Sequence, residues 1–187
     1  EAKNFFLKNK KKNIFVMNNF RFHPAIKVIK KNLNKIGKIF FVRAHFGNYL
    51  PNMRGTNYQN MYMSKKRLGG GVLLDSIHEL DYLLFLFGPI KSVLSNINKV
   101  SNLKIDTEDL VEAIIKHKNG ICTNLHLDYL RFYKLRGCEI VGENGMLNWQ
   151  SEGKNPEKCS VWIKFNNNKN KISLLKKTID VNKTYQD

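Results

Sequence analysis

Between Gly69 and Pro89 the apolar residues recur every three or four positions, which is the spacing of one face of an α-helix. The stretch begins with three glycines and ends at Gly88-Pro89, a pair that terminates helices because proline cannot continue the hydrogen-bond ladder. The apolar stripe consists of Leu73, Ile77, Leu80, Leu84 and Phe87. The opposite side carries Asp75, His78, Glu79 and Tyr82. The pattern predicts an amphipathic helix that packs through its apolar stripe and presents a polar face.

Apolar residues elsewhere follow two different periods. A second helix is predicted over residues 24–36, where Pro24 suits the first turn and Gly37 follows the last. Strand patterns cover residues 38–49, 90–100, 109–118, 121–130, 138–142, 146–149 and 161–165. The early residues of the first strand are apolar on both faces, as in a buried strand. Residues 50–68 lack a sustained period, so we expect a loop that leads into the glycines and can fold over the polar helix face.

Two hairpins are predicted, one from residues 109–118 and 121–130 and the other from residues 138–142 and 146–149. Asn119-Gly120 is the favoured type I′ turn pair, and residues 121–130 alternate cleanly between apolar and polar side chains. His117 is expected at the surface, and the polar side chains of the second strand are expected on an exposed or oligomer-forming sheet face. Because helices come first and antiparallel strands follow, we predict an α+β fold with an open, mostly antiparallel sheet and helices packed on one face.

Composition adds a strong charge bias. The 187 residues include 32 Lys+Arg against 15 Asp+Glu, for a formal net charge of +17. A nucleic-acid partner must therefore be considered. However, 26 of the basic residues are Lys and 6 are Arg, beside 24 Asn. Nucleic-acid sites favour Arg for bidentate contacts. Lys and Asn codons are A/T-rich, so we favour a biased genome as the cause and predict no specific nucleic-acid partner.

Other sequence features limit the class of protein. No apolar run approaches the ~20 residues that cross a bilayer, so no membrane association is predicted. The three cysteines lie far apart without a CxxC pair, which favours reduced thiols in a cytoplasmic protein and predicts no metal site. Gly69–Gly71 does not follow a strand and lacks the third glycine of GxGxxG, so no complete nucleotide site is present.

The polar helix face offers candidate chemistry. His78 follows Asp75 by three residues, so the carboxylate can orient the imidazole and support its protonated form. Such a pair beside a glycine-rich opening suits proton transfer to or from a substrate hydroxyl. The alternative is that this face simply meets water.

An ordered series of motifs resembles the Gfo/Idh/MocA oxidoreductases, most of all the branch found among sugar-modifying enzymes for surface polysaccharides. The motifs are FRFHP at 20–24, IGKI at 36–39, GGGVLLDSIHELDYLLFLFG at 69–88, DTED at 106–109, NG at 119–120, HLDYL at 126–130 and EIVGENGML at 139–147. The resemblance implies an N-terminal Rossmann domain that binds NAD or NADP and a C-terminal substrate domain. Residues 1–19 would be the last helix and strand of the first domain, and residues 20–187 an incomplete second domain that also forms homo-oligomers through its sheet face.

The resemblance also implies roles for particular residues. His78 matches the family's catalytic histidine and Asp75 its acidic partner, although many members space this pair four apart. Arg21 and His23 match the motif at the nicotinamide edge of the cleft; the alternatives are an ion-pair role for Arg21 and a packed core imidazole for His23. Substrate candidates in the loop before the glycines are Tyr49, Arg54 and Lys65.

Three functions are weighed against one another. The first is a fragment of an NAD(P)-dependent dehydrogenase that acts by hydride transfer on a sugar or sugar-nucleotide-like hydroxyl, with no cofactor expected to bind this chain alone. The second is a non-catalytic binding or scaffold domain. The third is a basic nucleic-acid-binding protein.

Overall fold

A computed structural model describes residue 7, residues 18–53 and residues 57–185. Its centre is an eight-stranded open sheet with the strand order β2-β3-β4-β1-β5-β6-β7-β8. The strands are β1 (Ile39–Gly47), β2 (Ile90–Asn98), β3 (Leu110–His117), β4 (Cys122–Asp128), β5 (Leu135–Gly142), β6 (Gly145–Glu152), β7 (Glu157–Phe165) and β8 (Ile172–Ile179). Strand β1 lies parallel to β4, and the other neighbouring pairs are antiparallel. The predicted α+β class is confirmed.

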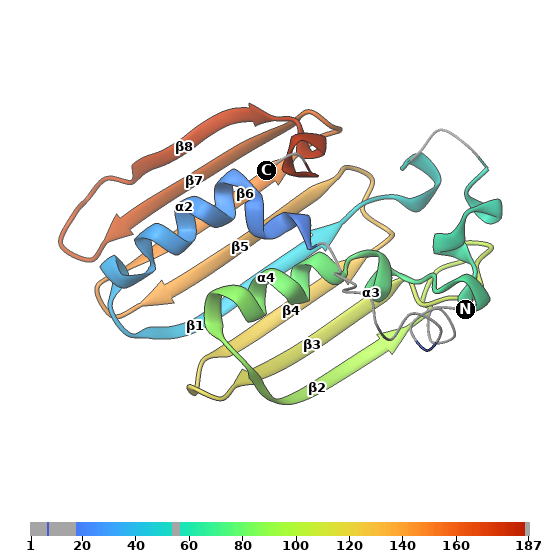
Figure 1. The fold of residues 1–187 in the computed structure, drawn as a ribbon, viewed down its shortest axis with the longest axis horizontal. Coiled ribbons are helices and arrows are strands. Elements are labelled where there is room, and N and C mark those ends of the chain that lie inside the picture. The colour runs from blue at the N-terminus through green and yellow to red at the C-terminus, as the bar shows by residue number, and fades with distance from the viewer. Residues whose placement is uncertain (1–6, 8–17, 54–56, 186–187) are drawn as a thin grey trace.

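Helices cover one face of this sheet (Figure 1). In β4 the side chains of Thr123, Leu125 and Leu127 are buried on the covered face, while Cys122 and Asn124 are exposed on the other. This alternation has the period of two that the sequence shows. The polar side of β4 therefore faces away from the helices, as predicted.

Helix α2 (Pro24–Asn32) begins where the sequence predicts. The Nδ1 atom of His23 accepts a hydrogen bond from the backbone N–H of Ala25 at 3.2 Å, which caps the helix N-terminus. Ile26 and Ile29 are fully buried. The helix lies over β6, β7 and β8 (Figure 1). It continues as a 3-10 helix over Leu33–Ile36.

The predicted single helix after the glycines is two helices. Helix α3 (Val72–Asp75) and helix α4 (Ile77–Phe87) are separated at Ser76, whose φ of −103° and ψ of 27° interrupt the helix. The predicted packing face is wrong in part. Phe87 of the apolar stripe is buried, but Ile77 and Leu84 are exposed, and Glu79 and Tyr82 of the predicted polar face are fully buried. The buried side of α4 also includes Leu83 and Leu86, and Glu79 is accommodated there because Arg136 on β5 donates a hydrogen bond to it.

Three further expectations need correction. His117 is completely buried, with Nδ1 2.8 Å from the carbonyl oxygen of Gly88. The start of β1 is not buried on both faces, because Phe40 and Phe41 are exposed. Strand β8 was not predicted, because its sequence is rich in lysine. Of the residues expected to belong to a Rossmann domain, residues 1–6 and 8–17 lie outside the described part of the chain.

Candidate functional site

The glycine turn before α3 is occupied by a side chain. Gly71, at φ 108°, donates its N–H to the carbonyl of Met63 at 2.9 Å. The carboxylate of Glu108 lies where a Cβ of Gly71 would be, and it accepts the N–H of Leu73 at 3.1 Å. The glycine-rich turn is therefore not open to a ligand at Gly71, because a carboxylate of the same chain fills the helix N-terminus. This turn does not fit the phosphates of a dinucleotide, which are anionic like Glu108.

His78 lies in the first turn of α4 and is half-buried. Its ring stacks on Phe20, with 5.1 Å between the ring centroids and 24° between the planes. Its Nδ1 atom is buried and has no hydrogen-bond partner among the described residues. Burial lowers the pKa of His78, and the Arg136 cation lowers it further against the opposing charges of Asp75 and Asp81. The imidazole is therefore neutral at pH 7 and suited to accept a proton.

Asp75 does not orient His78 by a hydrogen bond, in contrast to the expectation from the sequence. The hydroxyl of Tyr62, in the loop before the glycines, donates a short hydrogen bond to the Asp75 carboxylate. No hydrogen bond between Asp75 and His78 is present in the described part of the chain. The helix break at Ser76 changes the relative direction of the two side chains, so the i to i+3 geometry of a continuous helix does not apply. Asp75 acts on His78 through its charge alone.

Arg21 and His23 have different environments. Arg21 forms a two-pronged ion pair with Asp81, from Nε at 2.9 Å and from an Nη atom at 2.6 Å, and its side chain is 45% exposed. His23 is fully buried, stacks on Phe20 and lies 3.4 Å from the Glu157 carboxylate. Burial lowers the pKa of His23, so this contact joins a neutral imidazole to a carboxylate. His23 is a packed core imidazole without surface for a cofactor contact, and the predicted nicotinamide edge is left to Arg21.

A buried ion pair lies beside the site, and only its Glu79 member was on the predicted polar helix face. Arg136 donates from Nε to Glu79 at 2.6 Å, and both side chains are almost completely buried. The guanidinium also lies 4.2 Å from the ring centroid of Phe20. Burial raises the pKa of Glu79, and the Arg136 cation opposes that rise. One signal was available, since Glu79 sits within a strongly apolar helix where an unpaired carboxylate would be costly.

The contacts found for the substrate candidates Tyr49 and Lys65 are to groups other than His78. Tyr49 packs at a tilt against Phe132, a strongly exposed ring in the β4–β5 connection, with centroids 5.0 Å apart. Lys65 contributes its backbone carbonyl to the glycine turn, where it accepts the N–H of Gly70 at 3.1 Å. Arg54 lies outside the described residues.

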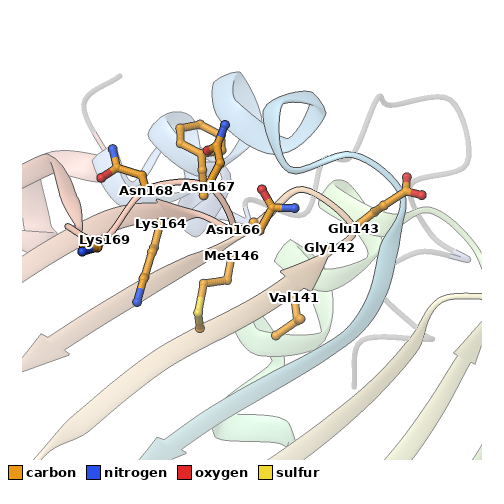
Figure 2. Close-up of a pocket in the computed structure, with 11 residues that line it drawn as sticks. Val141, Gly142, Glu143, Met146, Lys164, Asn166, Asn167, Asn168 and Lys169 are labelled. Carbon is orange, nitrogen blue, oxygen red and sulfur yellow. The ribbon is translucent and has the colours of Figure 1, made fainter.

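A pocket of about 650 Å³ opens at the other end of the sheet (Figure 2). It lies where the β5–β6 turn meets the β7–β8 connection, and Asn166, Asn167 and Lys164 contribute to its lining. Gly142 belongs to this pocket and is six residues from Arg136 along β5, which corresponds to roughly 20 Å at strand spacing. The pocket is therefore separate from the His78 region.

The described part of the chain contains no group of three or more His, Cys, Asp and Glu side chains that could hold a metal ion. Within the same residues, no helix is both long and apolar enough to cross a membrane.

The fold is an open sheet with helices on one face, and one of these helices carries a half-buried histidine. A family model described as the GFO/IDH/MocA C-terminal domain matches residues 29–148. The chain therefore belongs to the Gfo/Idh/MocA oxidoreductase family, as the motifs predict. A search of curated proteins found no matching sequence.

Solved structures of similar fold come from several bacteria. The WlbA dehydrogenase from Bordetella pertussis, solved with NADH and UDP-GlcNAcA, has a TM-score of 0.68 and 21% identity, over 83% of this chain and 44% of its own. An inositol dehydrogenase homologue from Azotobacter vinelandii, solved with NAD+, has a TM-score of 0.72 and 15% identity, over 92% of this chain and 46% of its own. The chain thus spans about half the length of the dehydrogenases that it resembles.

Proposed function

We propose that this chain is the substrate half of an NAD(P)-dependent dehydrogenase that oxidises a hydroxyl of a sugar or sugar nucleotide. Family membership supports the reaction class. The substrate class is supported by two neighbours, one solved with UDP-GlcNAcA and the other with myo-inositol. A role in surface polysaccharide synthesis in the cytoplasm is part of the same proposal.

The observation that carries the proposal is the environment of His78. A half-buried imidazole whose pKa is lowered by burial is neutral at pH 7, so it can accept the proton of a hydroxyl as that group is oxidised. Phe20 supports one face of the ring, which limits its rotation. The charge of Asp75 would stabilise the imidazolium once the proton has been transferred.

The dinucleotide would bind mainly outside this chain. The glycine turn at α3 does not fit its phosphates, and among the predicted cofactor contacts Arg21 alone has an exposed side chain. Such a cofactor accepts a hydride from the substrate carbon when it is bound. This chain would contribute the proton acceptor, the wall formed by Phe20 and α4, and substrate contacts from the loop whose Tyr62 binds Asp75.

The test is His78→Asn in a complete enzyme, made by joining this chain to the cofactor-binding domain of a relative. Turnover should fall by roughly 10²–10⁴, the usual contribution of a positioned acid–base group, while the KM for the cofactor is unchanged. Asp75→Asn should reduce turnover less and should lower the pKa that appears in the pH–rate profile, because a carboxylate that favours imidazolium is removed.

Circular dichroism and urea unfolding of both variants provide the control, since His78 stacks on a core residue. Full turnover in a folded His78→Asn enzyme would contradict the proposal and favour a non-catalytic binding domain.

A further inference from the structure

Phe20 joins three groups that are far apart in the sequence. Its ring is 3% exposed and lies in the short 3-10 helix Asn19–Phe22. His78 stacks on it from α4 with 5.1 Å between centroids, and His23 stacks on it from the start of α2 with 5.3 Å. The guanidinium carbon of Arg136, on β5, lies 4.2 Å from the same centroid. Arg136 and the solvent-accessible histidine of the site therefore contact one ring.

Arg136 is a permanent cation in a place where cations are costly. Its side chain is 6% exposed, and its guanidinium is also 4.5 Å from the centroid of Phe46. The fully buried carboxylate of Glu79 accepts its Nε–H at 2.6 Å. Two aromatic faces and one carboxylate thus fix the guanidinium in a single position. A well-packed apolar side chain would stabilise the fold as effectively as this ion pair. Stability alone therefore does not explain why a cation lies beside the site.

We propose that Arg136, held by Glu79 and packed on Phe20, is a positioning residue that keeps the His78 imidazole in its neutral, proton-accepting form. The inference rests on the proposed function, because a neutral imidazole is useful there only if His78 accepts a proton from substrate. A cation near an imidazole disfavours a second positive charge on the ring. The buried position strengthens this effect, since water does not screen the guanidinium.

Other charged groups face His78 and act in both directions. Asp75 on α3 and Asp81 on α4 raise its pKa, whereas burial and Arg136 lower it. Asp81 is itself neutralised by the ion pair with Arg21 and by a hydrogen bond from the side chain of Asn18 at 2.8 Å. Asp75 is bound by Tyr62. Arg136 also has a partner in Glu79, so all three charges act on His78 at reduced strength.

The experiment is an NMR titration of the five histidine side chains in the 187-residue chain, with the His78 signal assigned by its loss in His78→Asn. Arg136→Met should raise the pKa of His78 by about half a unit to one unit, because a nearby cation is removed. Glu79→Gln should shift the pKa of His78 in the opposite direction, because it leaves that cation unpaired. Arg136→Lys, which preserves the charge, should stay close to the parent value.

Arg43→Met is the matched control, since Arg43 is exposed and lies on the uncovered face of the sheet. It should leave the pKa of His78 unchanged. If Arg136→Met does not fold because Glu79 is left buried and unpaired, the double variant Glu79→Gln/Arg136→Met tests the proposal in its place. That variant should raise the pKa of His78, since it removes the Arg136 charge that lowers this pKa.

Opposite shifts in the two single variants distinguish a charge effect from a packing effect. If both variants move the His78 pKa upward towards 6.5, loosened packing is the cause and the inference fails. It also fails if none of the variants moves the pKa. The readout does not use turnover, so a failure of the proposed function would appear separately, as full activity of His78→Asn with the titration pattern intact.

Discussion

At the scale of single residues, a second set of buried charges determines how the protein responds to acid. Glu157 on β7 is fully buried, accepts a hydrogen bond from the Lys134 ammonium at 2.6 Å and lies beside His23. Burial alone would raise the pKa of Glu157, but His23 and Lys134 outweigh it and lower the pKa to about 2. The folded state therefore binds this proton less readily than the unfolded state, whose glutamate titrates near ~4.3.

The stabilisation from Glu157 is present above that unfolded pKa and is lost as the pH falls towards 2. Its size is about 3 kcal/mol from the pKa difference. Glu157→Gln should lower the free energy of unfolding at pH 7 and flatten its decline between about pH 5 and pH 2. Urea unfolding across this range measures the effect, with the exposed Glu143→Gln as control. Parallel pH profiles for Glu157→Gln and the parent chain would show that the ion pair contributes nothing.

At the scale of elements, the glycine turn and the broken helix depend on each other. Glu108 caps α3 only because Gly71 leaves room for its carboxylate and adopts a φ that favours glycine. The same turn holds Met63 and, through it, the loop residue Tyr62 that binds Asp75. The sequence predicted that a helix begins after these glycines, but the cap comes from a residue thirty-five positions away, which no local pattern can identify.

Gly71→Ala and Gly69→Ala form a matched pair that tests this dependence. Both positions have positive φ, but nothing lies within 4 Å of a Cβ at Gly69, whereas a Cβ at Gly71 would overlap the Glu108 carboxylate. Gly69→Ala should cost about 1 kcal/mol of unfolding free energy from backbone strain alone. Gly71→Ala should cost about 3 kcal/mol or more, because the cap is also lost. Equal losses in urea unfolding would show that Glu108 does not depend on the glycine.

At the scale of the whole molecule, the helices leave one face of the sheet uncovered (Figure 1). Leu94 on β2 and Ile114 on β3 are cross-strand partners on that face and are 72% and 48% exposed. Exposed apolar side chains on an uncovered sheet favour association with another surface. A second copy of the chain is the partner that we propose.

Ile114→Glu should therefore shift the chain from oligomer to monomer in sedimentation velocity, because a carboxylate would be buried without a partner at the contact. Leu68→Glu is the control, since Leu68 is equally exposed, at 47%, but lies in the loop outside the sheet. A parent chain that sediments as a monomer, or an Ile114→Glu oligomer of unchanged size, would contradict the proposed interface.

The sequence by itself determined most of the strands, helix α2 and the family. Alternation with a period of two specified β4 and its hairpin partner across Asn119-Gly120, and helical spacing after Pro24 specified α2. These signals are local, because each residue's side is set by the geometry of its own strand or helix. The ordered motifs identified the family, and they placed His78 on a helix beside a glycine turn.

Only the tertiary structure decided which face of α4 packs inward. Hydrophobicity favoured the apolar stripe as the packing face. Glu79 is nevertheless buried, because Arg136, 57 residues away in the sequence, donates a hydrogen bond to it on the sheet. The same holds for His23, which could have faced a cofactor until Glu157 and Phe20 enclosed it. A polar side chain can be buried only where a distant residue supplies its partner. Such pairings arise from the packing of helix on sheet, so no single stretch of the chain contains them.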